Sequence, residues 1–116
     1  MVYIIRPRKT PIGAFLSHGV WLAGTLYPAY PGRNTLRLAV QGHAGAPAPA
    51  KRVALVASMP GMAMTAIRAT LVARDHHYVG ALMLPMFGTY RAQVVVDTPA
   101  GRATGTLTLT LSLPHL

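Results

Sequence analysis

The sequence contains no cysteine and no glutamate, and its only carboxylate side chains are those of Asp75 and Asp97. Without cysteine, the chain forms no disulfides, zinc–thiolate sites or thiol nucleophiles. Two carboxylates, each in or beside a predicted turn, disfavour a glycosidase pair, a two-metal phosphoryl-transfer centre and a carboxylate-bound calcium site. No nucleophile, base and orienting residue occur at a short spacing either, so we predict that the chain is not an enzyme.

Aromatic residues are scarce, at 7% of the 116 residues. This disfavours the interleaving of aromatic and basic residues that single-stranded nucleic-acid binding uses, and we predict no nucleic-acid partner. No apolar run approaches the ~20 residues of a membrane span, and the start of the chain lacks the apolar stretch of a signal peptide. If the protein is exported, we therefore expect the sequence to be a processed form or a domain of a longer protein.

Turn-forming and β-forming residues are abundant, with 11 Gly, 10 Pro and 52% hydrophobic residues. Short runs with a period of two alternate with turn signals, and the last run alternates leucine with threonine. This pattern predicts an all-β fold, an immunoglobulin-like antiparallel β-sandwich of about seven strands. The predicted strands are 18–27, 34–43, 51–59, 64–73, 78–84, 89–97 and 103–113.

We predict one β-sandwich domain over residues 18–116, preceded by a basic, proline-containing arm over residues 1–17 that carries an edge strand. A helix over residues 62–73 is the main local alternative, because alanine and methionine favour helices. We prefer a strand there because the neighbouring runs are strands and the flanking loops are short.

If each strand reverses the direction of the one before it, five methionines gather at one end of the sandwich. Thioethers are soft, neutral ligands that suit copper(I), so this cluster is a candidate copper(I) site. Methionine also fills gaps in hydrophobic cores, and Met59 and Met83 fit that structural role as well. Met62, Met64 and Met86 fall in loops and are the preferred ligands. The candidate metal residues are Met59, Met62, Met64, Met83 and Met86.

The same alternation of strand directions places four histidines at the other end of the sandwich. Imidazoles bind copper(II) or zinc, so these residues form a possible second metal site. An exposed His-His pair is more often an ordinary polar turn than a metal site. The four residues are His18, His43, His76 and His77.

Basic residues far outnumber acidic ones, giving a net charge of +9. Most arginines are scattered, as on solvated strand faces, but Arg6, Arg8 and Lys9 form a basic patch in the arm. This charge indicates an alternative function, a non-catalytic structural or interaction domain of a membrane-associated assembly. Its partner would be an acidic protein or an anionic membrane surface.

A series of short motifs resembles the YtkA-like domain family. The motifs are P-G-x-N-T-L (31–36), G-x-P (45–47), M-P-G-M-x-M (59–64), Y-x-G (78–80) and L-P-M-x-G-x-Y (84–90). More distantly, the chain is similar to CopC-type periplasmic copper-binding β-sandwiches. It departs from these families by having Tyr90 where the last motif usually has tryptophan, and by lacking the N-terminal histidine ligand of the CopC type.

The resemblance implies a periplasmic or extracytoplasmic location, in some relatives attached to a membrane. It also implies a role in copper handling, with a copper-transport membrane protein as partner. The family's methionine positions correspond to Met59, Met62, Met64 and Met86 of this sequence.

Overall fold

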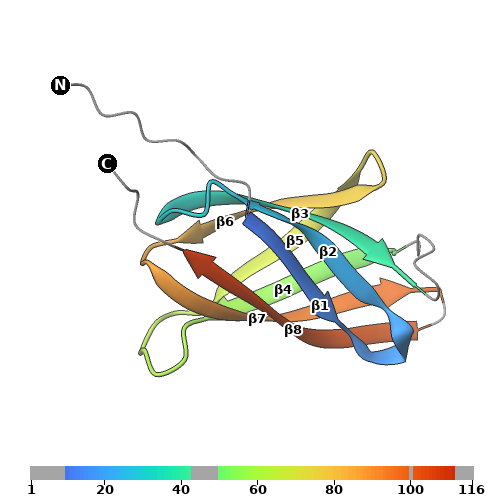
Figure 1. The fold of residues 1–116 in the computed structure, drawn as a ribbon. Coiled ribbons are helices and arrows are strands. Elements are labelled where there is room, and N and C mark those ends of the chain that lie inside the picture. Colours follow the sequence, from blue (N-terminus) through green and yellow to red (C-terminus); the bar gives the residue numbers. More distant parts are fainter. Residues whose placement is uncertain (1–9, 43–49, 100, 112–116) are drawn as a thin grey trace.

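The computed structural model describes residues 10–42, 50–99 and 101–111 (Figure 1). These residues form an all-β, antiparallel fold, as predicted, but with eight strands instead of about seven. The additional strand, Thr10–Phe15, lies at one edge of the sheet, within the arm 1–17 where the sequence predicted an edge strand. The elements are β1 (Thr10–Phe15), the 3-10 turn η1 (Ser17–Gly19), β2 (Trp21–Tyr27), β3 (Gly32–Gln41), β4 (Arg52–Ser58), β5 (Ile67–Arg74), β6 (His77–Leu84), β7 (Gly88–Thr98) and β8 (Gly101–Leu111).

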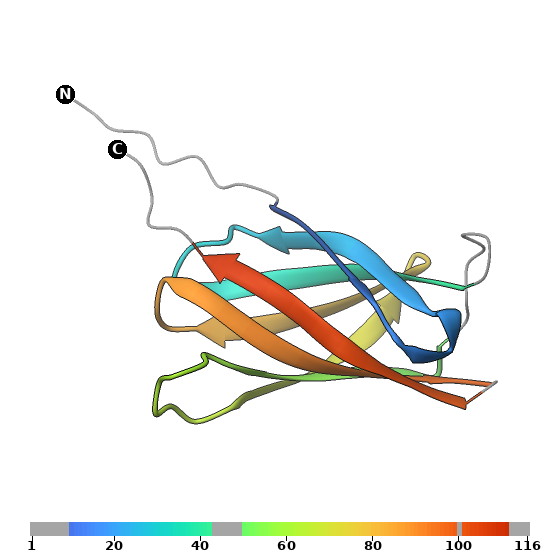
Figure 2. The ribbon, with the colours of Figure 1, turned by 60° about the horizontal axis from the view of Figure 1, so that its bottom comes forward.

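The strands form one continuous sheet in the order β1-β2-β3-β6-β5-β4-β7-β8. Strand β5 joins its two halves, because Ile67–Leu71 pair with β4 and Val72–Arg74 pair with β6. The sheet curls so that its two outer strands, β1 and β8, lie close together (Figure 2). At this seam the backbone N–H of Thr104 donates a 2.9 Å hydrogen bond to Ser17 Oγ. The result is a nearly closed barrel.

The core fills the space inside the curled sheet, and the period-two pattern decides which side chains enter it. In β8, Leu107, Leu109 and Leu111 are buried and the threonines between them are exposed. In β3, Leu36 and Leu38 point inward while Arg37 between them points outward. Alternation in the sequence therefore predicts the buried face correctly in these strands.

Residues 62–73 form no helix, so the helical alternative is wrong for this segment. The predicted strand 64–73 corresponds to β5, which starts at Ile67, three residues later than predicted. Met64 therefore lies in the loop before β5. His18 also differs from the prediction, because it lies in η1 with a positive φ of 60° and not in a strand. No described helix is long and apolar enough to cross a membrane.

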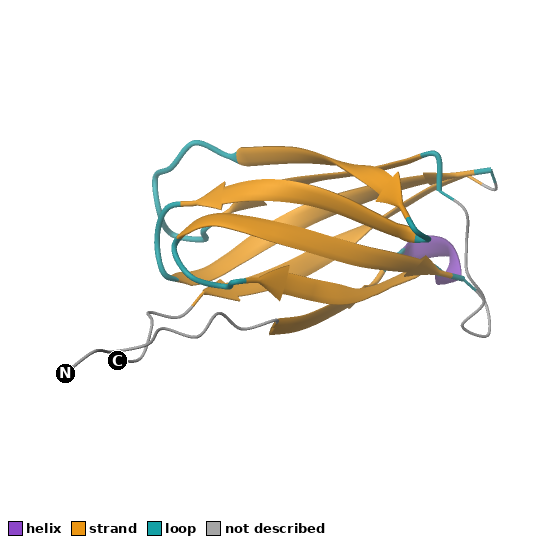
Figure 3. Ribbon diagram, turned by 90° about the horizontal axis from the view of Figure 1, so that it is seen from above, coloured by secondary structure: helices purple, strands orange, loops and turns teal. Residues whose placement is uncertain are grey.

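Strand register defines the two ends of the barrel. Gly32 opposes Leu84, Gly88 opposes Leu111, and Ser58 opposes Arg91 three residues into β7. The connections β2/β3, β4/β5 and β6/β7 therefore lie together at one end, and η1 lies at the other (Figure 3). This arrangement agrees with the predicted alternation of strand directions.

Candidate functional site

Five methionines lie at the end formed by the β4/β5 and β6/β7 connections, which we call the methionine end. Met59, Met62 and Met64 are in the loop after β4. Met83 is the next-to-last residue of β6, and Met86 is in the loop that follows. The structure thus brings to one end two groups of methionines that are separated by about twenty residues of sequence.

The five side chains differ in exposure, and so in what they can bind. Met62 and Met83 are exposed, at 51% and 59%. Met59, Met64 and Met86 are partly buried, and the first two pack against the hydrophobic core. Met62 is therefore open to an incoming ligand, whereas part of the Met59 and Met64 side chains already contacts the protein.

Met59 connects the two methionine loops. A Cβ atom built on Gly88, the first residue of β7, would lie 3.1 Å from Met59 Cε and 3.7 Å from its Sδ. The Met59 side chain thus lies against the backbone at the end of the β6/β7 loop. This contact supports the packing role that the sequence left open for Met59, and it holds the two loops next to each other.

Hydrogen bonds fix the backbone of both loops. In the first, the Met62 N–H donates to the Met59 carbonyl over 3.2 Å, around a turn in which Gly61 has a φ of 78°. In the second, the hydroxyl of buried Tyr90 donates to the Met86 carbonyl and accepts from the Met86 N–H. Met62 and Met86 therefore lie on backbone that hydrogen bonds hold in place before any ligand arrives.

The methionine end has no acidic or imidazole groups among the residues that the structure describes. Asp75 is in the β5/β6 turn and Asp97 is near the end of β7, both at the opposite end. Asp97 Oδ1 also accepts a 2.9 Å hydrogen bond from Arg102 Nε. A donor set of neutral thioethers without carboxylates suits a soft monovalent ion and offers little to magnesium, calcium or zinc.

Met83 is set apart from the other four by its neighbour. It lies directly across from Arg33 of β3, and both side chains are exposed on the outer face of the sheet. A guanidinium at this position repels a bound cation. Met83 is accordingly the weakest of the five candidate ligands.

The predicted histidine site falls at the opposite end. His18 is in η1, His76 is in the β5/β6 turn and His77 begins β6, whereas His43 is outside the described residues. The Nδ1 atom of His77 lies 3.0 Å from the Asp75 carbonyl oxygen and 3.3 Å from Arg37 Nη2. Over residues 10–42, 50–99 and 101–111, no three His, Asp or Glu side chains form a metal-holding group. The histidine site stays a prediction.

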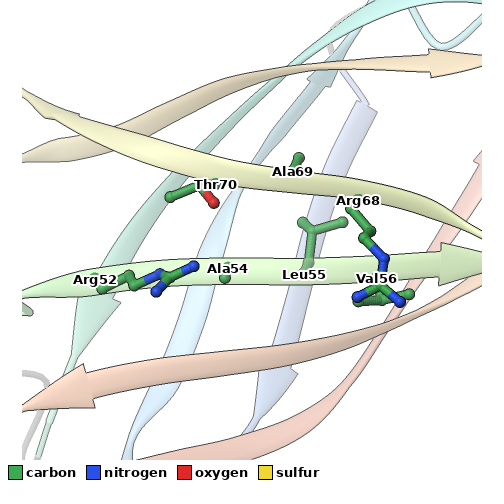
Figure 4. Close-up of a pocket in the computed structure, with 7 residues that line it drawn as sticks. All are labelled: Arg52, Ala54, Leu55, Val56, Arg68, Ala69 and Thr70. Carbon is green, nitrogen blue, oxygen red and sulfur yellow. The ribbon is translucent and has the colours of Figure 1, made fainter.

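Two arginines border a shallow hollow on the outer face of β4 and β5, with a volume of about 230 Å³ (Figure 4). Arg52 lies at one side of it and Arg68 at the other, with the short side chain of Ala54 between them. The sequence did not single out this pair, because Arg68 comes close to β4 only through its pairing with Val56. The predicted basic patch of Arg6, Arg8 and Lys9 lies outside the described residues.

Comparison of the chain with protein-family models, with curated proteins and with solved structures gives no match.

Proposed function

We propose that this chain is a small, non-catalytic copper(I)-binding module that works outside the cytoplasm. The observation that supports it best is the sorting of side chains between the two ends of the barrel. Five methionines from two connections and one strand end lie at one end, while both carboxylates and all described histidines lie away from it. Sorting of this kind favours a soft-metal site over a general cation site.

Met62, Met64 and Met86 are the proposed ligands. They lie in the two loops at the methionine end, and Met62 is exposed to solvent. Copper(I) is the first candidate because neutral sulfur donors favour it over harder, divalent ions. Met59 supports the site by packing on Gly88.

An immunoglobulin-like topology is part of the proposal. If β2 to β8 are read in chain order as strands A to G, the paired orders β2-β3-β6-β5 and β4-β7-β8 correspond to A-B-E-D and C-F-G. Tyr90 near the start of strand F, hydrogen-bonded to the backbone upstream, is a second feature of such domains. Both features support kinship with the YtkA-like and CopC-type sandwiches, and with it a copper-transport membrane protein as partner.

The proposal is tested by titrating copper(I) under anaerobic, reducing conditions against a chromogenic copper(I) chelator. We expect submicromolar affinity for the wild type and a loss of at least about tenfold for the triple variant Met62→Leu/Met64→Leu/Met86→Leu. Leucine keeps the volume and the apolar character of methionine but removes the sulfur. The matched control is Met83→Leu, at the position beside Arg33, which we expect to bind copper(I) like the wild type. A wild type that binds no tighter than micromolar, or a triple variant that binds as tightly as the wild type, contradicts the proposal.

A further inference from the structure

Large apolar side chains are exposed at the methionine end, and only one of them, Met62, is a proposed ligand. The described residues contain six exposed large hydrophobic side chains, and four of them lie at this end. Phe87 in the β6/β7 loop is 59% exposed and Tyr27 at the end of β2 is 42% exposed. Neither residue has a thioether, so copper(I) binding gives no reason for their exposure. The four residues are Tyr27, Met62, Met83 and Phe87.

These side chains project from separate segments around one end of the barrel. Tyr27 comes from β2, Met83 from β6, and Met62 and Phe87 from two different loops. The hollow bordered by two arginines lies elsewhere, on the outer face of β4 and β5. A partner that covers the whole end contacts all four at once, whereas a peptide in a groove contacts one side.

Charge at this end favours an anionic partner. Arg33 is the second residue of β3, Arg68 is the second residue of β5, and Arg91 opposes the last residue of β4. All three are exposed, and the two carboxylates lie at the other end of the barrel. Phe87 and Met62 lie in the loops at the tip, whereas Arg33 is level with Met83, and Tyr27 pairs with Thr35, two residues further from the tip. Long arginine side chains beside apolar residues suit a lipid bilayer, because their charged ends can extend to the phosphate level. Apolar groups enter the acyl boundary while arginines reach the phosphates.

We propose that the methionine end docks onto an anionic lipid bilayer, with Phe87, Met62, Met83 and Tyr27 entering the interface. Arg33 and Arg91 bind lipid phosphates around them. Exposed aromatic side chains suit the headgroup level, and each basic residue near an anionic surface adds to the attraction. The inference does not depend on copper, because it rests on apolar area and positive charge and not on sulfur.

The absence of cysteine from the chain makes a direct test possible. A single cysteine at Phe87 (Phe87→Cys), or at Phe15 (Phe15→Cys) as control, takes a polarity-sensitive dye. Phe15 is 87% exposed but lies beside η1, at the opposite end. With vesicles of phosphatidylcholine and phosphatidylglycerol, we expect a blue shift of the dye at position 87 and none at position 15. Equal shifts at both positions, or no shift at 87, would overturn the proposal.

Co-sedimentation with the same vesicles tests the contributing residues. We expect Phe87→Ser to weaken binding by about tenfold, the order expected for one lost aromatic contact, and Phe15→Ser to leave it unchanged. Arg33→Gln/Arg91→Gln should lower binding and reduce its dependence on salt. Two results count against an anionic bilayer as the partner. One is equal binding to vesicles of phosphatidylcholine alone, and the other is binding to an acidic protein but not to the vesicles.

The copper proposal and the bilayer proposal can each be refuted without the other. The triple variant with Leu at 62, 64 and 86 retains its apolar surface, so we expect it to sediment with anionic vesicles like the wild type. Phe87→Ser retains every methionine, so we expect it to bind copper(I) with wild-type affinity. Loss of vesicle binding in the triple variant would contradict the bilayer proposal, because leucine is at least as apolar as methionine.

Discussion

The hydroxyl of Tyr90 makes two hydrogen bonds to the backbone of Met86, donating to its carbonyl over 2.8 Å and accepting from its N–H over 2.9 Å. Tyr90 is fully buried, whereas Met86 is in a loop at the methionine end. One side chain thus ties the hydrophobic core to the loop that carries a proposed ligand. Tyr78 makes the same pair of bonds to Ala50 at the opposite end, at 2.9 Å each.

Tyr90→Phe should remove both bonds to Met86 while keeping the buried ring. Two partly buried backbone groups then lose their partner, and we expect the free energy of unfolding to fall by about 1–3 kcal/mol. Urea denaturation measures this loss. Copper(I) affinity should fall as well, because the Met86 loop is no longer fixed. A free energy of unfolding within about 0.5 kcal/mol of the wild-type value, as is usual for surface substitutions, would show that the two hydrogen bonds to Met86 contribute little to stability.

Asn34 performs a similar role in the β2/β3 connection. Its buried side chain accepts from the Ala29 N–H at 2.7 Å and donates to the carbonyls of Tyr30 and Gly32 at 2.8 and 3.1 Å. We expect Asn34→Ala to destabilise the fold by about 2–4 kcal/mol, because three backbone groups lose their partner. The exposed neighbour Thr35 provides the control: Thr35→Ala should change the free energy of unfolding by less than about 0.5 kcal/mol. Similar effects of the two substitutions would refute this role of Asn34.

The β5/β6 turn is the place where a substitution should stabilise the protein. Asp75 and His76 have φ values of 46° and 66°, in the left-handed region where glycine is preferred. His76→Gly should therefore raise the free energy of unfolding by about 0.5–1 kcal/mol. Thr70→Gly, at an exposed position in the regular strand β5, should lower it by a similar amount. Thermal melts of both variants compare the two effects, and a lower melting temperature for His76→Gly would disprove the expectation.

The strand pattern could be read from the sequence where local signals suffice. Leucine alternates with threonine over residues 106–111 of β8, and Arg74-Asp75-His76-His77 contains the turn before β6. Such features depend on neighbouring residues alone, so periodicity and turn propensity predict them.

Features that depend on distant segments could not be predicted in the same way. The sequence predicted an edge strand in the arm, but not its position or its partners, because Pro11 and Gly13 disfavour strands and β1 is held by pairing with β2 and by the seam with β8. The packing of Met59 against Gly88 and the pairing of Arg68 with Val56 require the strand register. The sequence predicted that the methionines share an end and that Met59 could pack on the core. It was wrong to allow the same role for Met83, which is exposed, and it did not indicate that Met64 packs against the core.

The central claim, that thioethers at the methionine end bind copper(I), is tested most directly by NMR of the methionine ε-methyl groups. The protein is labelled with ¹³C at these methyls and titrated with copper(I). We predict that the resonances of Met62, Met64 and Met86 shift together and saturate at one equivalent, while that of Met83 beside Arg33 stays in place. Unchanged resonances, or equal and unsaturated shifts of all the methyl groups, would contradict the claim.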